Sequence, residues 1–360
     1  MTKLGVLFSV LGVGAGCIPA FAQKQLPNII VMLSDDQGWG DLGFTGNTFV
    51  QTPNIDRIAH EGTILENFYV CPVSSPTRAE FLTGRYHVRS GVNSTTGGGE
   101  RFNLAEYFRE AGYATSLFGK WHSGTQYPYH PNARGFEEFY GFCSGHWGNY
   151  WNPVLEHNGE IISGEGFIID DLTDKALDYI RDHKEHPFFM FLSYNTPHSP
   201  MQVPDSWWNR VKDRTLSQRA TFPEQEDTTF TKAALALAEN LDWNIGRVLS
   251  LLHSLDLEQE TIVIYFSDNG PNSFRWNGGM KGRKGSTDEG GVRSPFCIRW
   301  PGHIRKGAVE TQLSGAIDLI PTLLGLAGIE YTPLRKLDGI DWGQRLLDEK
   351  APAIDRVLYS

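Results

Sequence analysis

The chain has 360 residues, of which 40% are hydrophobic, and a formal net charge of −10 at pH 7. This length is sufficient for one large domain, or two modest ones, with a substantial core. The negative charge and the lack of a run dense in Lys or Arg argue against a nucleic-acid-binding protein that works by neutralising phosphates.

The first 22 residues have the pattern of a secretory signal peptide. Lys3 precedes an apolar run from Leu4 to Val13, and the small-residue site Ala20-Phe21-Ala22 is followed by polar residues. We therefore expect cleavage after Ala22, a mature chain of residues 23–360 and a periplasmic or secreted location. A lipoprotein anchored through Cys17 is the second interpretation. No later stretch approaches the roughly 18 uninterrupted apolar residues of a membrane span.

The cysteines beyond the signal peptide are Cys71, Cys143 and Cys297. They are odd in number, far apart and without Cys-x-x-Cys spacing, so the sequence suggests neither a disulfide framework nor a zinc site. We expect buried free thiols.

Strands and helices alternate along the predicted chain. Continuous β-branched and aliphatic runs predict buried strands, and apolar residues at three-to-four spacing predict helices. The predicted strands cover residues 28–34, 114–118, 188–193, 261–267 and 296–300. The predicted helices cover residues 53–61, 103–110, 171–184, 230–255 and 315–328.

Two stretches lack such periodicity. Residues 124–166 are rich in Tyr, Trp, His, Asn, Pro and Gly, which indicates long surface loops of the kind that often carry substrate contacts. Residues 207–227 are polar and mixed.

The segment Ser74-Ser75-Pro76-Thr77-Arg78 places a small hydroxyl residue before a segment of helical character. The partial positive charge of a helix N-terminus and the Arg78 guanidinium would favour an anion beside Ser74. An ordinary Ser/Pro turn that caps a helix is the alternative.

The alternation predicts an α/β fold with a mainly parallel central sheet and helices on both faces. Ligands of such sheets bind beyond the carboxyl ends of the strands. The side chains that directly follow four of the predicted strands are ionisable or able to bind metal: Asp35 and Asp36, Lys120 and His122, His198, and Asp268 and Asn269. A cap or a turn explains each of them alone, but their convergence at one edge favours a functional site.

The motif Ser-x-Pro-Thr-Arg at residues 74–78, followed by Leu-Thr-Gly-Arg at residues 82–85, resembles the maturation signature of the type I sulfatases, within the alkaline phosphatase superfamily. Similar segments follow the family's order along nearly the whole mature chain: residues 34–41, 52–56, 119–122, 196–198, 267–270 and 284–291. The resemblance implies an alkaline phosphatase-like fold and a sulfuric ester hydrolase of the arylsulfatase type.

The resemblance also implies that Ser74 is oxidised after translation to formylglycine (3-oxoalanine), whose hydrated aldehyde is the nucleophile. Serine at this position implies an anaerobic sulfatase-maturating enzyme as a partner. Cys71 is out of register with Pro76 and Arg78 and is not expected to take its place.

The metal ligands implied by the resemblance are Asp35, Asp36, Asp268 and Asn269, together with the oxygen at position 74. These hard oxygen donors suit Ca²⁺, or alternatively Mg²⁺, and argue against zinc.

The catalytic roles follow from the matched positions and from the charge of a sulfate ester. Arg78 and Lys120 are expected to stabilise the position-74 alkoxide, and Lys284, with Lys281 nearby, to hold the sulfate. His198 is expected to be the general acid for the departing alcohol, and His122 the base that eliminates sulfate.

We expect a sulfated carbohydrate or an aryl sulfate as the substrate. The aromatic segment at residues 145–151, with His146 and Trp147, suits a sugar-stacking wall, and core packing is the alternative. A phosphodiester or phosphonate ester hydrolase of the same superfamily is a second functional hypothesis. A catalytically silent protein that binds sulfated glycans, with Ser74 unmodified, is a third.

Relatives generally continue beyond residues 355–360 into a small antiparallel sheet with a packed helix. We therefore expect this C-terminal subdomain to be missing or incomplete in the present chain.

Overall fold

The computed structural model describes residues 26–92 and 103–359, so the predicted signal peptide lies outside the described residues. The strands are β1 (Asn28–Ser34), β2 (Thr63–Leu65), β3 (Phe68–Tyr69), β4 (Ala114–Lys120), β5 (Glu138–Phe142), β6 (Val154–His157), β7 (Glu160–Ser163), β8 (Phe188–Ser193), β9 (Thr261–Ser267), β10 (Phe296–Arg299), β11 (Ala308–Glu310) and β12 (Ser314–Gly315). The α-helices are α1 (Pro53–Glu61), α2 (Ser74–Thr83), α3 (His87–Ser90), α4 (Leu104–Glu110), α5 (Ile168–Asp182), α6 (Asp205–Val211), α7 (Thr228–Ser254), α8 (Glu289–Val292), α9 (Leu319–Ala327) and α10 (Gly343–Leu347). The 3₁₀ turns are η1 (Pro131–Arg134), η2 (Pro223–Gln225), η3 (Glu258–Glu260) and η4 (Ala316–Asp318).

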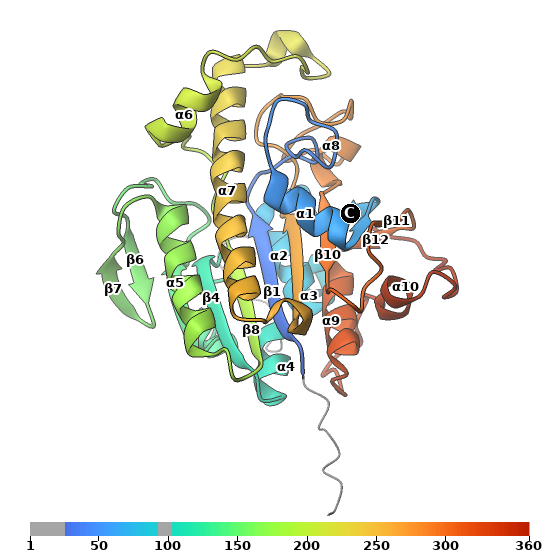
Figure 1. Ribbon diagram of the computed structural model, residues 1–360. Coiled ribbons are helices and arrows are strands. Elements are labelled where there is room, and N and C mark those ends of the chain that lie inside the picture. Colours follow the sequence, from blue (N-terminus) through green and yellow to red (C-terminus); the bar gives the residue numbers. More distant parts are fainter. Residues whose placement is uncertain (1–25, 93–102, 360) are drawn as a thin grey trace, which may run out of the picture.

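One large sheet runs through the described part of the chain (Figure 1), in the order β11-β2-β10-β9-β1-β8-β4-β5-β6-β7. Its five central strands, from β9 to β5, are all parallel. Antiparallel pairs occur where β10 meets β9 and β2 on one side, and where β6 meets β5 and β7 on the other. The predicted mainly parallel α/β fold is confirmed.

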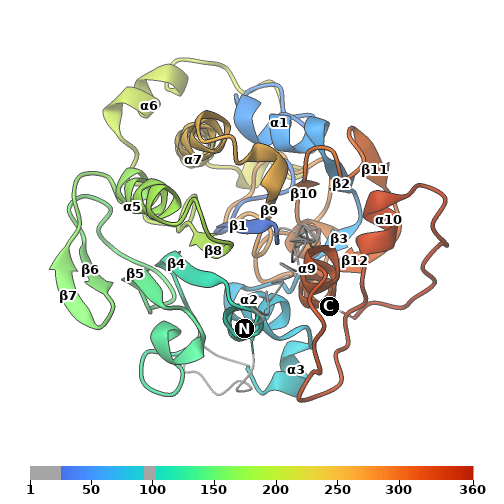
Figure 2. The same ribbon diagram turned by 60° about the horizontal axis from the view of Figure 1, so that its bottom comes forward.

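The strand β1 lies near the centre of the sheet, between β9 and β8, and all seven of its residues are buried. Its Val31 is in register with Phe191 of β8 and Ile264 of β9. Alternate side chains face opposite layers: Val31 belongs to the core with α2, α4 and α9, whereas Met32 belongs to the core with α1, α5 and α7. Figures 1 and 2 show these two helical layers on opposite faces of the sheet.

The predicted surface loops at residues 124–166 are only partly confirmed, because this stretch contains η1 and the strands β5, β6 and β7. The last two form an antiparallel hairpin at the edge of the sheet and bury mainly Leu155, so their apolar pattern is weak. The helix α5 begins three residues before the predicted start because Ile168 and Ile169 are buried in the core. The stretch at residues 207–227 contains the end of α6 and the 3₁₀ turn η2.

The cysteines within the described residues are free, and Cys71 and Cys297 are buried as expected, while Cys143 is partly exposed. Over residues 26–92 and 103–359, no helix combines the length and the apolar character that crossing a bilayer requires.

Candidate active site

The carboxyl ends of β1, β4 and β9 meet at one edge of the sheet. Two backbone hydrogen bonds join the segments that follow the strands: Asp35 N donates to Thr196 O (3.1 Å), and Asp268 N donates to Ser34 O (3.2 Å). The strand-end side chains predicted from the sequence are almost completely buried here: Asp35, Asp36, Lys120, Asp268 and Asn269. The structure therefore brings together the groups that the strand-end argument selected.

Ser74 is the first residue of α2 and is buried. Its hydroxyl donates a hydrogen bond to Asp268 Oδ2. Arg78, one helical turn later, donates from Nε to Ser74 Oγ (3.0 Å) and from Nη2 to Asp268 Oδ2 (2.9 Å). Its Nη1 donates to Ser193 Oγ (2.7 Å), so the guanidinium is held at several points against the Ser74 oxygen.

Two lysines pair with the two acids after β1. Lys120 Nζ lies 2.7 Å from Asp35 Oδ2, and both side chains are fully buried. Lys284 Nζ lies 2.6 Å from Asp36 Oδ1, and the lysine side chain is 26% exposed. Lys284 therefore reaches solvent at the entrance of the site, whereas Lys120 is enclosed within it.

Burial and neighbouring charges perturb these groups strongly. Burial raises the pKa of Asp35 to about 6, although Lys120 opposes the shift. Burial acts in the same direction on Asp268, but the charges of Arg78 and Lys120 outweigh it and hold the pKa of that carboxyl well below its usual range. Burial lowers the pKa of Lys120, and Asp35 opposes that shift.

Three buried oxygens of this cluster accept no hydrogen bond within the described residues: Asp35 Oδ1, Asp36 Oδ2 and Asn269 Oδ1. Leaving such atoms unpaired costs free energy, so a cluster of them indicates residues suited to hold a cation. Carboxylate and amide oxygens are the donors that Ca²⁺ and Mg²⁺ prefer. The residues therefore fit the hard divalent cation that the sequence resemblance implies.

Two histidines flank the site. His198 Nε2 lies 3.4 Å from Asp36 Oδ2, and its Nδ1 lies 2.6 Å from the Ser199 carbonyl, which can only accept, so Nδ1 carries a proton. His122 has no hydrogen bond on either ring nitrogen among the described residues. Burial and the positive charges of Lys120 and Arg78 lower the pKa of His122 to about 2, so its imidazole is neutral.

A cavity of about 360 Å³ opens onto Ser74, and its lining includes Lys120, His122, His198 and Lys284. Gly145 closes one wall, where a Cβ would lie 2.5 Å from His122 Nε2. A larger cavity of about 670 Å³, between α5 and the strands β4 and β5, contains none of these groups.

The predicted substrate residues differ in position. The exposed His146 lines the smaller cavity, and its ring stacks at 5.9 Å on that of His198. Trp147 instead stacks at 5.3 Å on Phe142 and packs against the core, which corresponds to the packing alternative. Lys281 pairs with Asp288 (3.3 Å) and does not line the cavity.

Sequence reasoning did not find the buried pair formed by Arg275 and Asp41. Arg275 Nε donates to Asp41 Oδ1 (2.8 Å), and its Nη2 donates to the carbonyl of Asp36 (3.0 Å). Asp36 has a left-handed backbone with φ of 62°, which the pair helps to hold. Asp41 stands in a motif that was recognised, but no local signal connects it with an arginine 234 positions later.

These features together are those of a hydrolase for anionic esters: oxygen donors for a divalent cation, a buried hydroxyl at a helix N-terminus, and surrounding fixed cations. The family model "Sulfatase" matches residues 27–329. The chain is 32% identical over 398 residues to N-acetylgalactosamine-6-sulfatase of Mus musculus, covering 99% of this chain and 72% of that protein.

Solved structures agree with this match. Ps i-CgsB in complex with k-i-k-neocarrahexaose has a TM-score of 0.79 and 32% identity, covering 89% of this chain and 76% of that one. A Bacteroides thetaiotaomicron protein described with the metabolism of multiple glycosaminoglycans has a TM-score of 0.80 and 26% identity, covering 92% and 79%. The chain belongs to the sulfatase family of the alkaline phosphatase superfamily and is a sulfuric ester hydrolase.

Proposed function

We propose that this protein removes sulfate from a sulfated carbohydrate, with a formylglycine nucleophile derived from Ser74 and a Ca²⁺ ion held by Asp35, Asp36, Asp268 and Asn269. One observation carries the proposal. Unpartnered buried oxygens from the segments that follow β1 and β9 belong to the same hydrogen-bonded cluster as a hydroxyl that Arg78 fixes at the start of α2.

The charges of the site support a divalent cation. The three acids Asp35, Asp36 and Asp268 are matched by three cations, Arg78, Lys120 and Lys284, so the formal charges cancel. A bound Ca²⁺ would polarise the sulfuryl oxygens and leave the site with two net positive charges. A sulfate monoester carries one negative charge and would be attracted to such a site.

The basic side chains divide into two roles. Arg78 already donates to the oxygen at position 74, and Lys120 lines the same cavity as Ser74, so we assign both to the stabilisation of negative charge on that oxygen. Lys284 lines the cavity and is partly exposed, which suits a group that binds the incoming sulfate. Its pKa is raised, because Asp36 and Asp35 outweigh the effect of burial, so it stays charged.

The histidines suit two proton transfers. His198 carries a proton on Nδ1 and turns Nε2 toward the carboxylates, so in its doubly protonated form Nε2 can donate to the departing alcohol. His122 borders the cavity, and neither of its ring nitrogens has a hydrogen bond within the described residues, so it is placed to accept a proton when sulfate is eliminated.

The carbohydrate substrate rests on the relatives. The murine relative is named for the 6-sulfate of N-acetylgalactosamine, and Ps i-CgsB was solved in complex with k-i-k-neocarrahexaose. The exposed His146 at the cavity can contact such a sugar. A maturase that oxidises serine is the partner required for the nucleophile, and the N-terminal segment, outside the described residues, would send the protein to the periplasm or outside the cell.

Two measurements test the proposal. Protein co-expressed with an anaerobic sulfatase-maturating enzyme should have a peptide at Ser74 that is about two mass units lighter, since oxidation removes two hydrogens. That protein should desulfate N-acetylgalactosamine 6-sulfate or a sulfated galactan oligosaccharide with Ca²⁺, and Ser74→Ala should not. Full activity with an unshifted mass would refute the nucleophile, and faster hydrolysis of a matched phosphodiester would refute the substrate class.

A further inference from the structure

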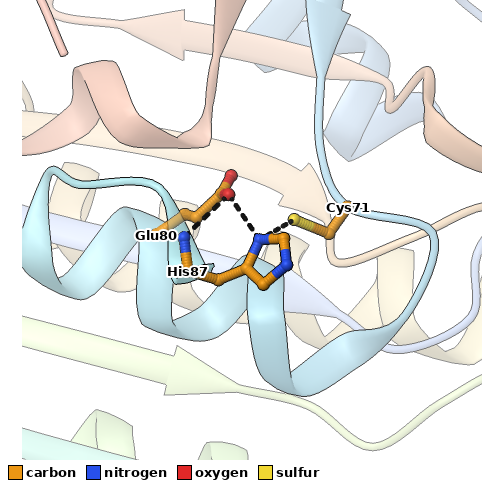
Figure 3. Close-up of side chains that lie close together, drawn as sticks. All are labelled: Cys71, Glu80 and His87. Atoms are coloured by element: carbon orange, nitrogen blue, oxygen red, sulfur yellow. Dashed lines mark hydrogen bonds and ion pairs between the residues drawn. The ribbon is translucent and has the colours of Figure 1, made fainter. Parts of the chain in front are cut away.

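A second group of metal-binding side chains lies near the catalytic helix. Cys71 precedes α2, Glu80 stands on that helix, and His87 begins α3. His87 Nδ1 lies 3.3 Å from Cys71 Sγ and 2.9 Å from Glu80 Oε1, and Figure 3 shows the three side chains turned toward one another. One donor atom from each residue lies within 4.8 Å of the other two.

The cluster is buried but can be reached from solvent. Cys71 is 1% exposed and Glu80 is 5% exposed. The His87 side chain is 25% exposed, so an ion can enter along the imidazole. Burial, together with the charge of Glu80, raises the pKa of the Cys71 thiol, so without a metal the thiol stays protonated and is a poor nucleophile.

The donor set and its spacing suit zinc. Thiolate, imidazole and carboxylate are the protein ligands of Zn²⁺, and tetrahedral coordination at usual bond lengths separates sulfur from nitrogen by roughly 3.5 Å. The observed separation of 3.3 Å therefore needs little change to admit the ion. We propose that Cys71, Glu80 and His87 form a Zn²⁺ site, distinct from the catalytic centre, with a fourth position open to water.

Cys71 and His87 change their protonation when the proposed site binds Zn²⁺. The Sγ–H bond of Cys71 breaks as the Zn–S bond forms, and the proton leaves to solvent, as for other thiolate ligands. Nδ1 of His87 lies 2.9 Å from Glu80 Oε1, which can only accept, so it carries a proton before the ion binds. That proton leaves to solvent while Nε2 takes one up, and the neutral ring then binds through Nδ1 and Glu80 through Oε1. The ion would tie the segment before Ser74 to α2 and α3, because Cys71 is also bound through its N–H to Thr77 Oγ1 (2.9 Å) on α2.

A similar cluster of His130, Cys143 and Glu156 is less suited to a metal. Asn132 N donates to His130 Nδ1, so that nitrogen carries no proton and a neutral ring has its proton on Nε2. That Nε2 lies 2.6 Å from Glu156 Oε1, and Cys143 Sγ is 4.0 Å from the other carboxylate oxygen. All three of these residues are only partly buried, and the Cys143 sulfur lies farther from its partner than the Cys71 sulfur does from His87, so Cys143 provides a matched control.

Cobalt reports thiolate ligation directly. We would saturate the full protein with Ca²⁺, remove other metals and titrate with Co²⁺, following the thiolate-to-cobalt charge-transfer band. The catalytic centre contains no thiolate among its proposed ligands and cannot produce this band. We expect one equivalent of Co²⁺ to give the band, and Zn²⁺ to abolish it by displacing the cobalt.

The variants decide the assignment. Cys71→Ser should lose the band, His87→Gln should weaken Co²⁺ binding by about 10-fold or more, and Cys143→Ser should retain the wild-type titration. His87 is partly exposed, so its variant keeps the test valid if Cys71→Ser does not fold. No band in the wild-type protein, or a band that is lost in Cys143→Ser and kept in Cys71→Ser, would overturn the proposal.

Discussion

Replacing Asp41 by Asn should weaken both the fold and the metal site, although Asp41 is not itself a proposed metal ligand. The side chains of Asp41 and Arg275 are each 1% exposed, and the carboxylate receives two arginine nitrogens as well as Gly38 N (2.7 Å). Asparagine keeps the shape of the side chain but removes the charge. The Arg275 guanidinium would then remain buried without a counter-ion.

The size of the effect follows from that burial. Removing one partner of a buried ion pair costs about 3–5 kcal/mol because the other charge stays uncompensated. Hydrogen bonds from Arg275 to Ser273 Oγ (2.9 Å) and to the Asp36 carbonyl persist, so we expect the lower end, about 3 kcal/mol. Because Arg275 also fixes the Asp36 backbone, Ca²⁺ affinity should fall by about 10- to 100-fold.

Urea unfolding with EDTA gives the stability change separately from the metal, and calorimetric Ca²⁺ titration gives the affinity. The control is Asp178→Asn, which breaks an ion pair with Arg181 whose side chains are 66% and 52% exposed and should cost under about 1 kcal/mol. In the double variant Asp41→Asn/Arg275→Met the buried charge is gone, so part of the stability should return. Equal stability losses in Asp41→Asn and Asp178→Asn, or unchanged Ca²⁺ affinity, would refute the positioning role.

Three further predictions concern the site itself. The folded protein holds the pKa of His122 at about 2, against an ordinary value of 6.5, so the unfolded chain takes up a proton first as the pH falls. The stability present above pH 6.5 therefore falls by up to about 1.4 kcal/mol per pH unit below it. In urea melts from pH 7 to 5, His122→Gln should flatten this slope, whereas the control His60→Gln, at an exposed residue, should not. Calcium at 100 times its Kd should raise the unfolding free energy by about 2.7 kcal/mol, and an equal rise in Asp268→Asn would contradict its role as a ligand. A Cβ at Gly145 meets His122, so Gly145→Ala should lower kcat by about 10- to 100-fold, while Gly148→Ala, whose Cβ meets nothing within 4 Å, should keep the wild-type rate.

The central strands were predictable because their signal is local. The predicted bounds of β1 and β9 match the structure, since a continuous apolar run is what burial on both faces requires. The edge strands β6 and β7 escaped prediction because their side chains are largely exposed and their pairing, not their composition, defines them. The reversed direction of β10 against β9 is likewise a tertiary property.

The residues of the active site likewise fall into those that the sequence could predict and those that it could not. Asp35 and Asp268 could be selected because each directly follows a strand, and Lys120 because it ends one, and parallel strands bring their carboxyl ends to one edge of the sheet. Arg275 could not, because it lies in an irregular segment and its role depends on a partner distant in sequence. The cluster around Cys71 was missed for a related reason, since its metal donors have no characteristic spacing and meet only when α2 and α3 fold against each other.

The buried charges of the active site are better explained by function than by stability. Arg78 and Asp268 are fully buried, and such pairs repay their desolvation poorly; apolar side chains of similar volume often stabilise a fold as well or better. The unpartnered oxygens of Asp35 and Asp36 add a further cost that no hydrogen bond within the described residues offsets. A fold under selection for stability alone would remove these groups, whereas a protein that must attract an anion and stabilise charge on a buried oxygen must keep them. The strongly apolar central strands supply the stability that allows the carboxyl edge of the sheet to remain so highly charged.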